Sequence, residues 1–187
     1  MDTTTLIVIF GVFLIVAAGI VVLILLKKRK TERLRTRFGP EYARALAESG
    51  GRRQGEAGLQ EREKRVKGFA IRPLAPKDRE VYIESWRKVQ AQFVDDPKSS
   101  VTQADQLLGA VMCTRGYSVS DFEQRSADIS VDHPLVVENY RSAHEIAVRH
   151  ARGQASTEDL RQAMIHYRTL FDELVGEPKL VSAKAAA

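Results

Sequence analysis

Two histidines beside a glutamate form the pattern closest to a catalytic motif. In His144-Glu145-x-x-x-x-His150 the histidines lie six residues apart. The zinc-protease motif His-Glu-x-x-His spaces its histidines by four, so that both imidazoles share one helix face. A spacing of six turns the second imidazole by about 240° around a helix. We therefore expect no two-histidine zinc site, and the sequence predicts no metal ligands.

The single cysteine and the motif content also argue against an enzyme. Cys113 follows Val-Met in a predicted amphipathic helix. A nucleophilic cysteine needs a neighbouring base and an activating environment, so we expect Cys113 to pack as a small hydrophobic side chain. The sequence contains no phosphate-binding loop, no dinucleotide-binding glycine pattern and no nucleophile elbow. We predict no catalytic residue and no cofactor, and that the protein is not an enzyme.

The stretch between residues 121 and 141 is denser in polar side chains than a simple helical bundle requires. Acidic residues stabilise the first turns of helices. The interpretation we favour is therefore that Asp121, Glu123 and Asp132 cap helix starts and pair with arginines at the surface. The alternatives are a corner that binds a partner and a paired-carboxylate site for acid–base chemistry. The candidate corner comprises Asp121, Arg125, Asp132, His133, Asn139 and Arg141.

An apolar segment near the N-terminus predicts a membrane anchor. Residues 6–26 include no polar side chain over 21 positions. A helix of that length spans roughly 31 Å, which matches a hydrocarbon core of about 30 Å. A cleaved signal peptide is the alternative, but residues 1–5 lack a basic side chain and the apolar core is longer than such peptides have. Gly11 and Gly19 allow a weak homodimer through this helix.

The basic charge of the chain lies directly after this apolar segment. Residues 27–37 contain seven Lys and Arg against Glu32, whereas residues 38–187 contain 22 basic and 22 acidic residues. The overall charge of +5 is thus a juxtamembrane feature, and we expect no nucleic-acid binding. The positive-inside rule places the N-terminus outside and the rest of the chain in the cytoplasm. The residues expected to set this orientation and contact lipid headgroups are Lys27, Lys28, Arg29 and Lys30.

The elements after the anchor all have helical periodicity. We expect residues 31–37 to continue the anchor helix, Pro40 to start a new one, and 52–67 to form an exposed, charged connector that is helical in part. Bundle helices are expected at 77–94, at 97–115, from Ser120, from Asp132, and from Ser156 to Gly176.

The sequence predicts an all-α protein with an N-terminal transmembrane helix, a charged helical stalk and a small antiparallel helical bundle. The predicted parts are an N-terminal tail (1–5), a transmembrane helix (6–26), a basic juxtamembrane segment and stalk (27–75), the bundle (76–176) and a flexible tail (177–187).

Several short segments resemble those of uncharacterised bacterial single-pass membrane-anchored proteins. The segments are Arg-Phe-Gly-Pro-Glu-Tyr (37–42), Phe-Val-Asp-Asp-Pro (93–97), Arg-Gly-Tyr (115–117), Asp-Phe-Glu-Gln-Arg (121–125), Ser-Val-Asp-His-Pro (130–134) and Asn-Tyr-Arg (139–141). The resemblance implies a bacterial inner-membrane protein with the same layout. It implies no activity and no ligand for any residue of this chain.

The function expected from these patterns is interaction or scaffolding at the inner face of the plasma membrane. The expected partners are the lipid bilayer and an unidentified protein. One alternative is a small-ligand sensor or an enzyme that uses the polar corner between residues 121 and 141. A second alternative is an envelope protein whose bundle lies outside the membrane, which only the basic run of residues 27–37 opposes.

Overall fold

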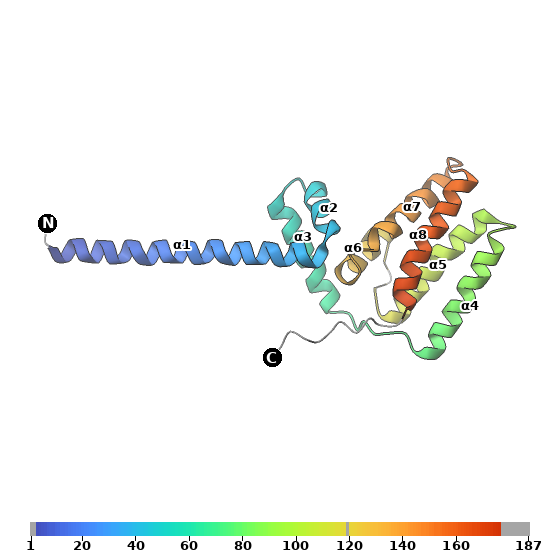
Figure 1. Ribbon diagram of the computed structural model, residues 1–187, viewed down its shortest axis with the longest axis horizontal. Helices are drawn as coiled ribbons and strands as arrows, with labels where there is room; N and C mark the ends of the chain where they lie inside the picture. The colour runs from blue at the N-terminus through green and yellow to red at the C-terminus, as the bar shows by residue number, and fades with distance from the viewer. Residues whose placement is uncertain (1–2, 119, 177–187) are drawn as a thin grey trace. The chain divides into compact units, whose positions relative to one another are not determined.

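The computed structural model describes the backbone of residues 3–118 and 120–176, and the side chains within them except those of residues 3–9 and 12. Eight helices and no strand occur in these ranges, which confirms the predicted all-α class. The predicted tail at 177–187 and the first two residues lie outside the described residues. The helices are α1 (Thr3–Phe38), α2 (Pro40–Glu48), α3 (Arg52–Lys67), α4 (Pro76–Gln92), α5 (Pro97–Arg115), α6 (Phe122–Asp132), α7 (Val137–Ala151) and α8 (Thr157–Val175) (Figure 1).

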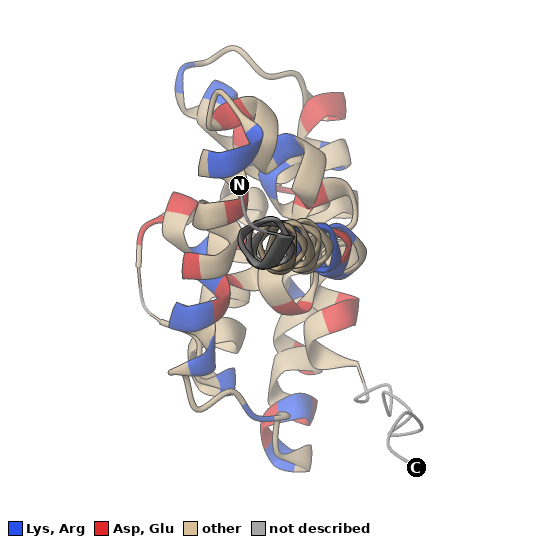
Figure 2. Ribbon diagram, turned by 90° about the vertical axis from the view of Figure 1, so that its left-hand side faces the viewer, with Lys and Arg blue, Asp and Glu red and all other residues tan. Residues whose placement is uncertain are grey.

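The chain divides into two compact units, Met1–Leu59 and Gln60–Ala187, and the division falls inside α3. In the first unit, α1 runs for 36 residues without a break, so the prediction that residues 31–37 continue the N-terminal helix is confirmed. Its charged residues lie toward its C-terminal end (Figure 2). Among the residues described, no helix has an apolar stretch long enough to cross a membrane.

The α2 and α3 helices of the first unit approach each other at a glycine. Gly39 has a φ of 48°, which glycine adopts readily, and Pro40 then starts α2 as predicted. At the crossing, a Cβ on Gly55 of α3 would lie 2.9 Å from Leu46 Cα. Leu59 on α3 is fully buried. The expectation that residues 52–67 form an exposed connector is therefore wrong, although the segment is helical throughout.

A polar network centred on Glu56 joins the three helices of this unit. Its carboxylate accepts hydrogen bonds from Thr31 Oγ1 (2.8 Å), Tyr42 OH (2.8 Å) and Arg52 Nε (2.9 Å). Arg52 Nη2 also donates to Thr31 Oγ1 at 2.6 Å. Burial raises the pKa of Glu56, but the hydrogen bonds from these three side chains outweigh it, and the pKa is lowered. The network therefore favours an ionised Glu56 in the folded unit.

The second unit is a helical bundle in which α8 packs against α4, α5 and α7. The α4–α5 and α7–α8 hairpins are antiparallel, whereas α5 and α8 run in the same direction (Figure 1). The ends of these two parallel helices meet where Arg115 Nη1 donates to Leu174 O at 3.1 Å. The predicted helical bundle is thus confirmed. Short connections predict antiparallel neighbours, whereas α5 and α8 are a parallel pair that is not directly connected. Its largest fully buried side chains include Tyr140, Tyr167, Leu108 and Leu170.

Most predicted helix ends are confirmed. Asp96 caps α5, Gly116 ends it with a φ of 98°, and Ser156 and Asp159 form a reciprocal capping box at α8. The capping box expected at Ser120 is wrong, because Asp121 caps α6 by accepting from Gln124 N at 2.8 Å.

The predicted helix start at Asp132 and the predicted packing of Cys113 are also wrong. Asp132 is the last residue of α6, since Pro134 disfavours a helical conformation at His133. The next helix begins only at Val137. Cys113 is exposed, because the buried face of α5 passes through Val111 and Met112 and leaves position 113 toward solvent.

We predict that Gly55→Ala weakens the α2–α3 contact by about 1–3 kcal/mol, because the added methyl group overlaps the Leu46 backbone. Hydrogen exchange of α2 amides in the full chain would measure the loss of protection. Gly58→Ala is the matched control, because a Cβ there meets no atom within 4 Å and alanine favours the helix. Equal protection in the two variants would contradict the tight crossing.

Candidate functional site

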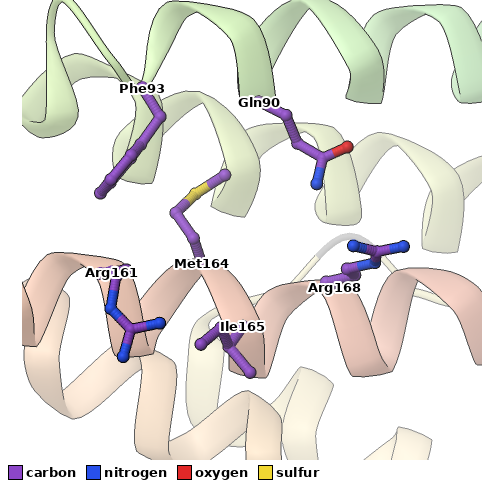
Figure 3. A pocket seen from close by; sticks show the side chains of 6 residues that line it. All are labelled: Gln90, Phe93, Arg161, Met164, Ile165 and Arg168. Atoms are coloured by element: carbon purple, nitrogen blue, oxygen red, sulfur yellow. The ribbon is translucent and has the colours of Figure 1, made fainter.

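A groove lies between α4 and α8 in the described part of the bundle. Its volume is about 150 Å³, and it is lined by Gln90 of α4, by Phe93 just after α4, and by Arg161, Met164, Ile165 and Arg168 of α8 (Figure 3). The α8 side chains come from positions 161, 164, 165 and 168, which share one helix face. The groove thus combines an apolar floor with two guanidinium groups.

The floor of the groove belongs partly to the bundle core. Met164 is 8% exposed, and Phe93, the residue after α4, packs against the core. Trp86 and Phe171 stack nearby on the same two helices, with ring centroids 4.7 Å apart. Such aromatic stacking favours one fixed separation of the helices. Ile165, by contrast, is 45% exposed and presents an apolar side chain to solvent.

The two arginines of the groove have acidic neighbours on their own helix. Arg161 donates to Glu158 at 2.7 and 2.6 Å, and its hydrogen bond, with a second from Gln162, lowers the pKa of Glu158 to about 2. Arg168 Nε lies 3.5 Å from Asp172. Within the described residues, Arg161 Nη1 and both Nη atoms of Arg168 have no hydrogen-bond partner. These donors remain free for an anion at the rim.

The polar corner predicted between residues 121 and 141 is divided among different surroundings. Asp121 caps α6, whereas Asp132 accepts a hydrogen bond from Tyr117 OH at 3.1 Å. Asn139 is paired with His166 at 2.8 Å. The prediction that Asp121 caps a helix is confirmed. The prediction that Asp132 caps a helix start is wrong, because Asp132 is the last residue of α6.

The two arginines of this corner differ in exposure, because Arg141 is buried and Arg125 is half-buried. Arg141 is 5% exposed, so it lies inside the bundle and not at the surface where it was expected. Arg125 lies against α5, where a Cβ on Gly109 would come within 2.8 Å of its Nη1. The buried Arg125 Nε has no hydrogen-bond partner. Asp121 and Asp132 are exposed, whereas Arg125, His133 and Asn139 are half-buried, so the members of the corner differ in their access to solvent.

His133 occupies a partly buried position between the ends of α6 and α8. Its Nδ1 lies 3.2 Å from Glu173 Oε1. Burial lowers the pKa of His133, and the nearby Arg115 lowers it further, although the Glu173 carboxylate acts in the opposite direction. His144 stacks on Phe122 with ring centroids 3.5 Å apart, and burial lowers its pKa too. Both histidines thus favour the neutral form in the folded bundle.

An ion pair that the sequence analysis missed joins α3 to α6. Arg65 Nη2 and Nε lie 2.8 Å from Asp128 Oδ1, and Gln124 Nε2 donates to the same oxygen at 2.9 Å. The Asp128 side chain is 2% exposed. Little in the sequence indicates this pair, because the partner of Asp128 lies 63 residues away.

We predict that Asp128→Ala lowers the free energy of unfolding of the bundle by about 2–3 kcal/mol, because it leaves Arg65 and Gln124 without their acceptor. The loss stays below that of a fully buried pair because Arg65 is 33% exposed. Urea unfolding followed by the fluorescence of Trp86 would measure it. Asp95→Ala, which removes an exposed carboxylate, is the control. Equal midpoints in the two variants would contradict a stabilising role for the pair.

We also predict that His133→Gln reduces the pH dependence of stability. The pKa of His133 is lower in the folded than in the unfolded chain, so below about pH 6.5 the unfolded chain binds more protons. The free energy of unfolding therefore falls as the pH falls through this range. Urea unfolding between about pH 5 and 7.5 should show a smaller slope in the variant, with His144 contributing equally in both chains. Identical slopes would contradict the lowered pKa of His133.

The chemistry that these features support is non-covalent binding. No group of three or more His, Cys, Asp or Glu in the described part of the chain is arranged to hold a metal ion. The groove offers guanidinium donors beside an apolar hollow, an arrangement suited to an amphipathic anionic ligand. Comparisons with known protein families, with curated proteins and with solved structures find no match. The function proposed for this chain therefore rests on its own residues.

Proposed function

We propose that this chain is a single-pass membrane protein that holds a small helical interaction domain at the inner face of a bacterial plasma membrane. The observation that supports this most strongly is the apolar stretch at residues 6–26 followed at once by Lys27, Lys28, Arg29 and Lys30. An apolar span followed by basic residues is the pattern of an uncleaved membrane anchor.

The exposed surface of α1 supports the anchor. Every large hydrophobic side chain described between Phe10 and Leu26 is at least 50% exposed. Soluble monomeric proteins rarely leave a continuous apolar surface of this extent in contact with water. A helix also satisfies its own backbone hydrogen bonds, as a lipid environment requires. Acyl chains around this part of α1 would remove the apolar surface from water.

The charge pattern supports the orientation and a role in binding proteins rather than nucleic acids. Lys27 and the three basic residues after it are exposed on α1, where they suit anionic headgroups at about 1 kcal/mol each. In the bundle, basic and acidic residues are interspersed along the helices (Figure 2). The groove between α4 and α8 then provides a surface on which a protein partner could bind.

A topology experiment tests this proposal. With a C-terminal tag on the full chain, protease treatment of intact spheroplasts should leave the tag undigested, because the bundle is in the cytoplasm. A periplasmic protein that is digested and a cytoplasmic protein that is not are the controls for intactness. Replacement of Lys27, Lys28, Arg29 and Lys30 by Glu should expose the tag in part of the population, because the orientation signal is reversed.

Two outcomes would contradict the proposal. Digestion of the tag in the unmodified chain would place the bundle outside the membrane and indicate an envelope protein. Extraction of the chain from membranes by sodium carbonate would show that residues 6–26 do not span the bilayer.

A further inference from the structure

We propose that the groove between α4 and α8 binds an acidic amphipathic helix of a partner protein. One large apolar side chain of that helix would fill the hollow, and carboxylates on either side of it would pair with Arg161 and Arg168. The inference builds on the proposed role as an interaction protein and names the chemistry of the partner.

The size of the hollow sets the size of the apolar anchor. A cavity of about 150 Å³ lined by apolar side chains accommodates one benzene ring. The hollow here has about this volume, and Phe93, Met164 and Ile165 supply its apolar lining. Its volume therefore suits one Phe, Leu or Met side chain of a bound partner. Proteins commonly bind an amphipathic helix by seating apolar side chains of that helix in a groove.

The spacing of the cations favours a helical partner with acidic residues. Arg161 and Arg168 lie seven residues apart on α8, with the exposed Ile165 between them. Seven residues correspond to about 10.5 Å along a helix. A partner helix with Asp or Glu about one turn before and after its apolar anchor matches this distance. The unpaired Nη atoms of both arginines can then bind those carboxylates.

The same charge pattern argues against a second copy of this chain in the groove. The exposed strip of α8 has the order Glu158, Arg161, Ile165, Arg168, Asp172. If two copies paired antiparallel about Ile165, Arg161 would face Arg168 and Glu158 would face Asp172. A parallel pairing would also set like charges against each other. Like charges across an interface cost affinity, so a partner with the opposite pattern fits better.

A defined peptide tests the inference on the full chain in nanodiscs of zwitterionic phosphatidylcholine. The probe is a fluorescein-labelled, alanine-based helical peptide of about 18 residues with one central Leu and Glu three and four residues to each side. Fluorescence anisotropy should detect binding to the unmodified chain. Arg161→Glu with Arg168→Glu should weaken it about tenfold or more. A peptide with Lys in place of Glu should bind this double variant better than it binds the unmodified chain.

The matched control is Arg72→Glu with Lys77→Glu, which changes the net charge equally at exposed positions near the start of α4. It should bind the acidic peptide as the unmodified chain does. Equal binding by both double variants, or an equal loss in both, would overturn the inference. Self-association of the chain that is abolished by Ile165→Glu would assign the groove to a second copy instead.

The result is separable from the test of the proposed function. The topology experiment concerns residues 6–26 and the basic run after them, and no variant of the groove changes either. A chain with a protected tag that fails to bind the peptide would refute only the inference about the groove.

Discussion

The burial of α8 on three of its sides is the constraint on which the bundle depends. This helix packs against α4, α5 and α7, and eight of its side chains are buried. A helix with so wide an apolar surface cannot be stable at the edge of a protein, so its neighbours must enclose it. Only one strip remains in contact with solvent, and it carries Arg161, Ile165 and Arg168. The groove lies where α4 covers only part of the surface of α8.

Buried polar groups add a second constraint, because each needs a partner inside the protein. Tyr167 on α8 donates to Asp105 on α5 at 3.2 Å, which fixes the two parallel helices relative to each other. Asp128 on α6 accepts from Arg65. This pair holds the end of a charged helix against the bundle, although the composition of that helix is typical of a solvated connector. The ion pair between Arg65 and Asp128 therefore adds the end of α3 to the bundle.

In the first unit, the Glu56 network gives the basic end of α1 a defined tertiary environment. A hydroxyl on α1, a phenol on α2 and a guanidinium on α3 all bind one carboxylate. In the membrane protein that we propose, the segment after the anchor is then a folded element and not a free stalk. Its rigidity would limit how far the anchor can move independently of the helices that follow it. In that protein the anchor would bind the lipid bilayer, and the groove would bind a partner protein.

The sequence by itself determined the helices, most of their ends and the apolar segment with its basic flank. These features depend on neighbouring residues: Asp96 and Gly116 end their helix through local backbone geometry, and Ser156 caps through Asp159 three positions away. Where a cap was misplaced, at Ser120, the neighbouring Asp121 offered an equally good acceptor. Local competition of this kind shifts an element by one residue and leaves the fold class unchanged.

Only the tertiary structure decided which helix faces meet. The parallel arrangement of α5 and α8, the ion pair between Arg65 and Asp128 and the groove that Phe93 shares with Ile165 all join residues more than 60 positions apart. The residues of the polar corner have different surroundings for the same reason, because Arg141 is buried in the bundle while Asp121 is exposed at the start of α6. Periodicity tells which side of a helix is apolar, but it does not identify the partner that covers that side. That choice depends on the packing of the whole bundle.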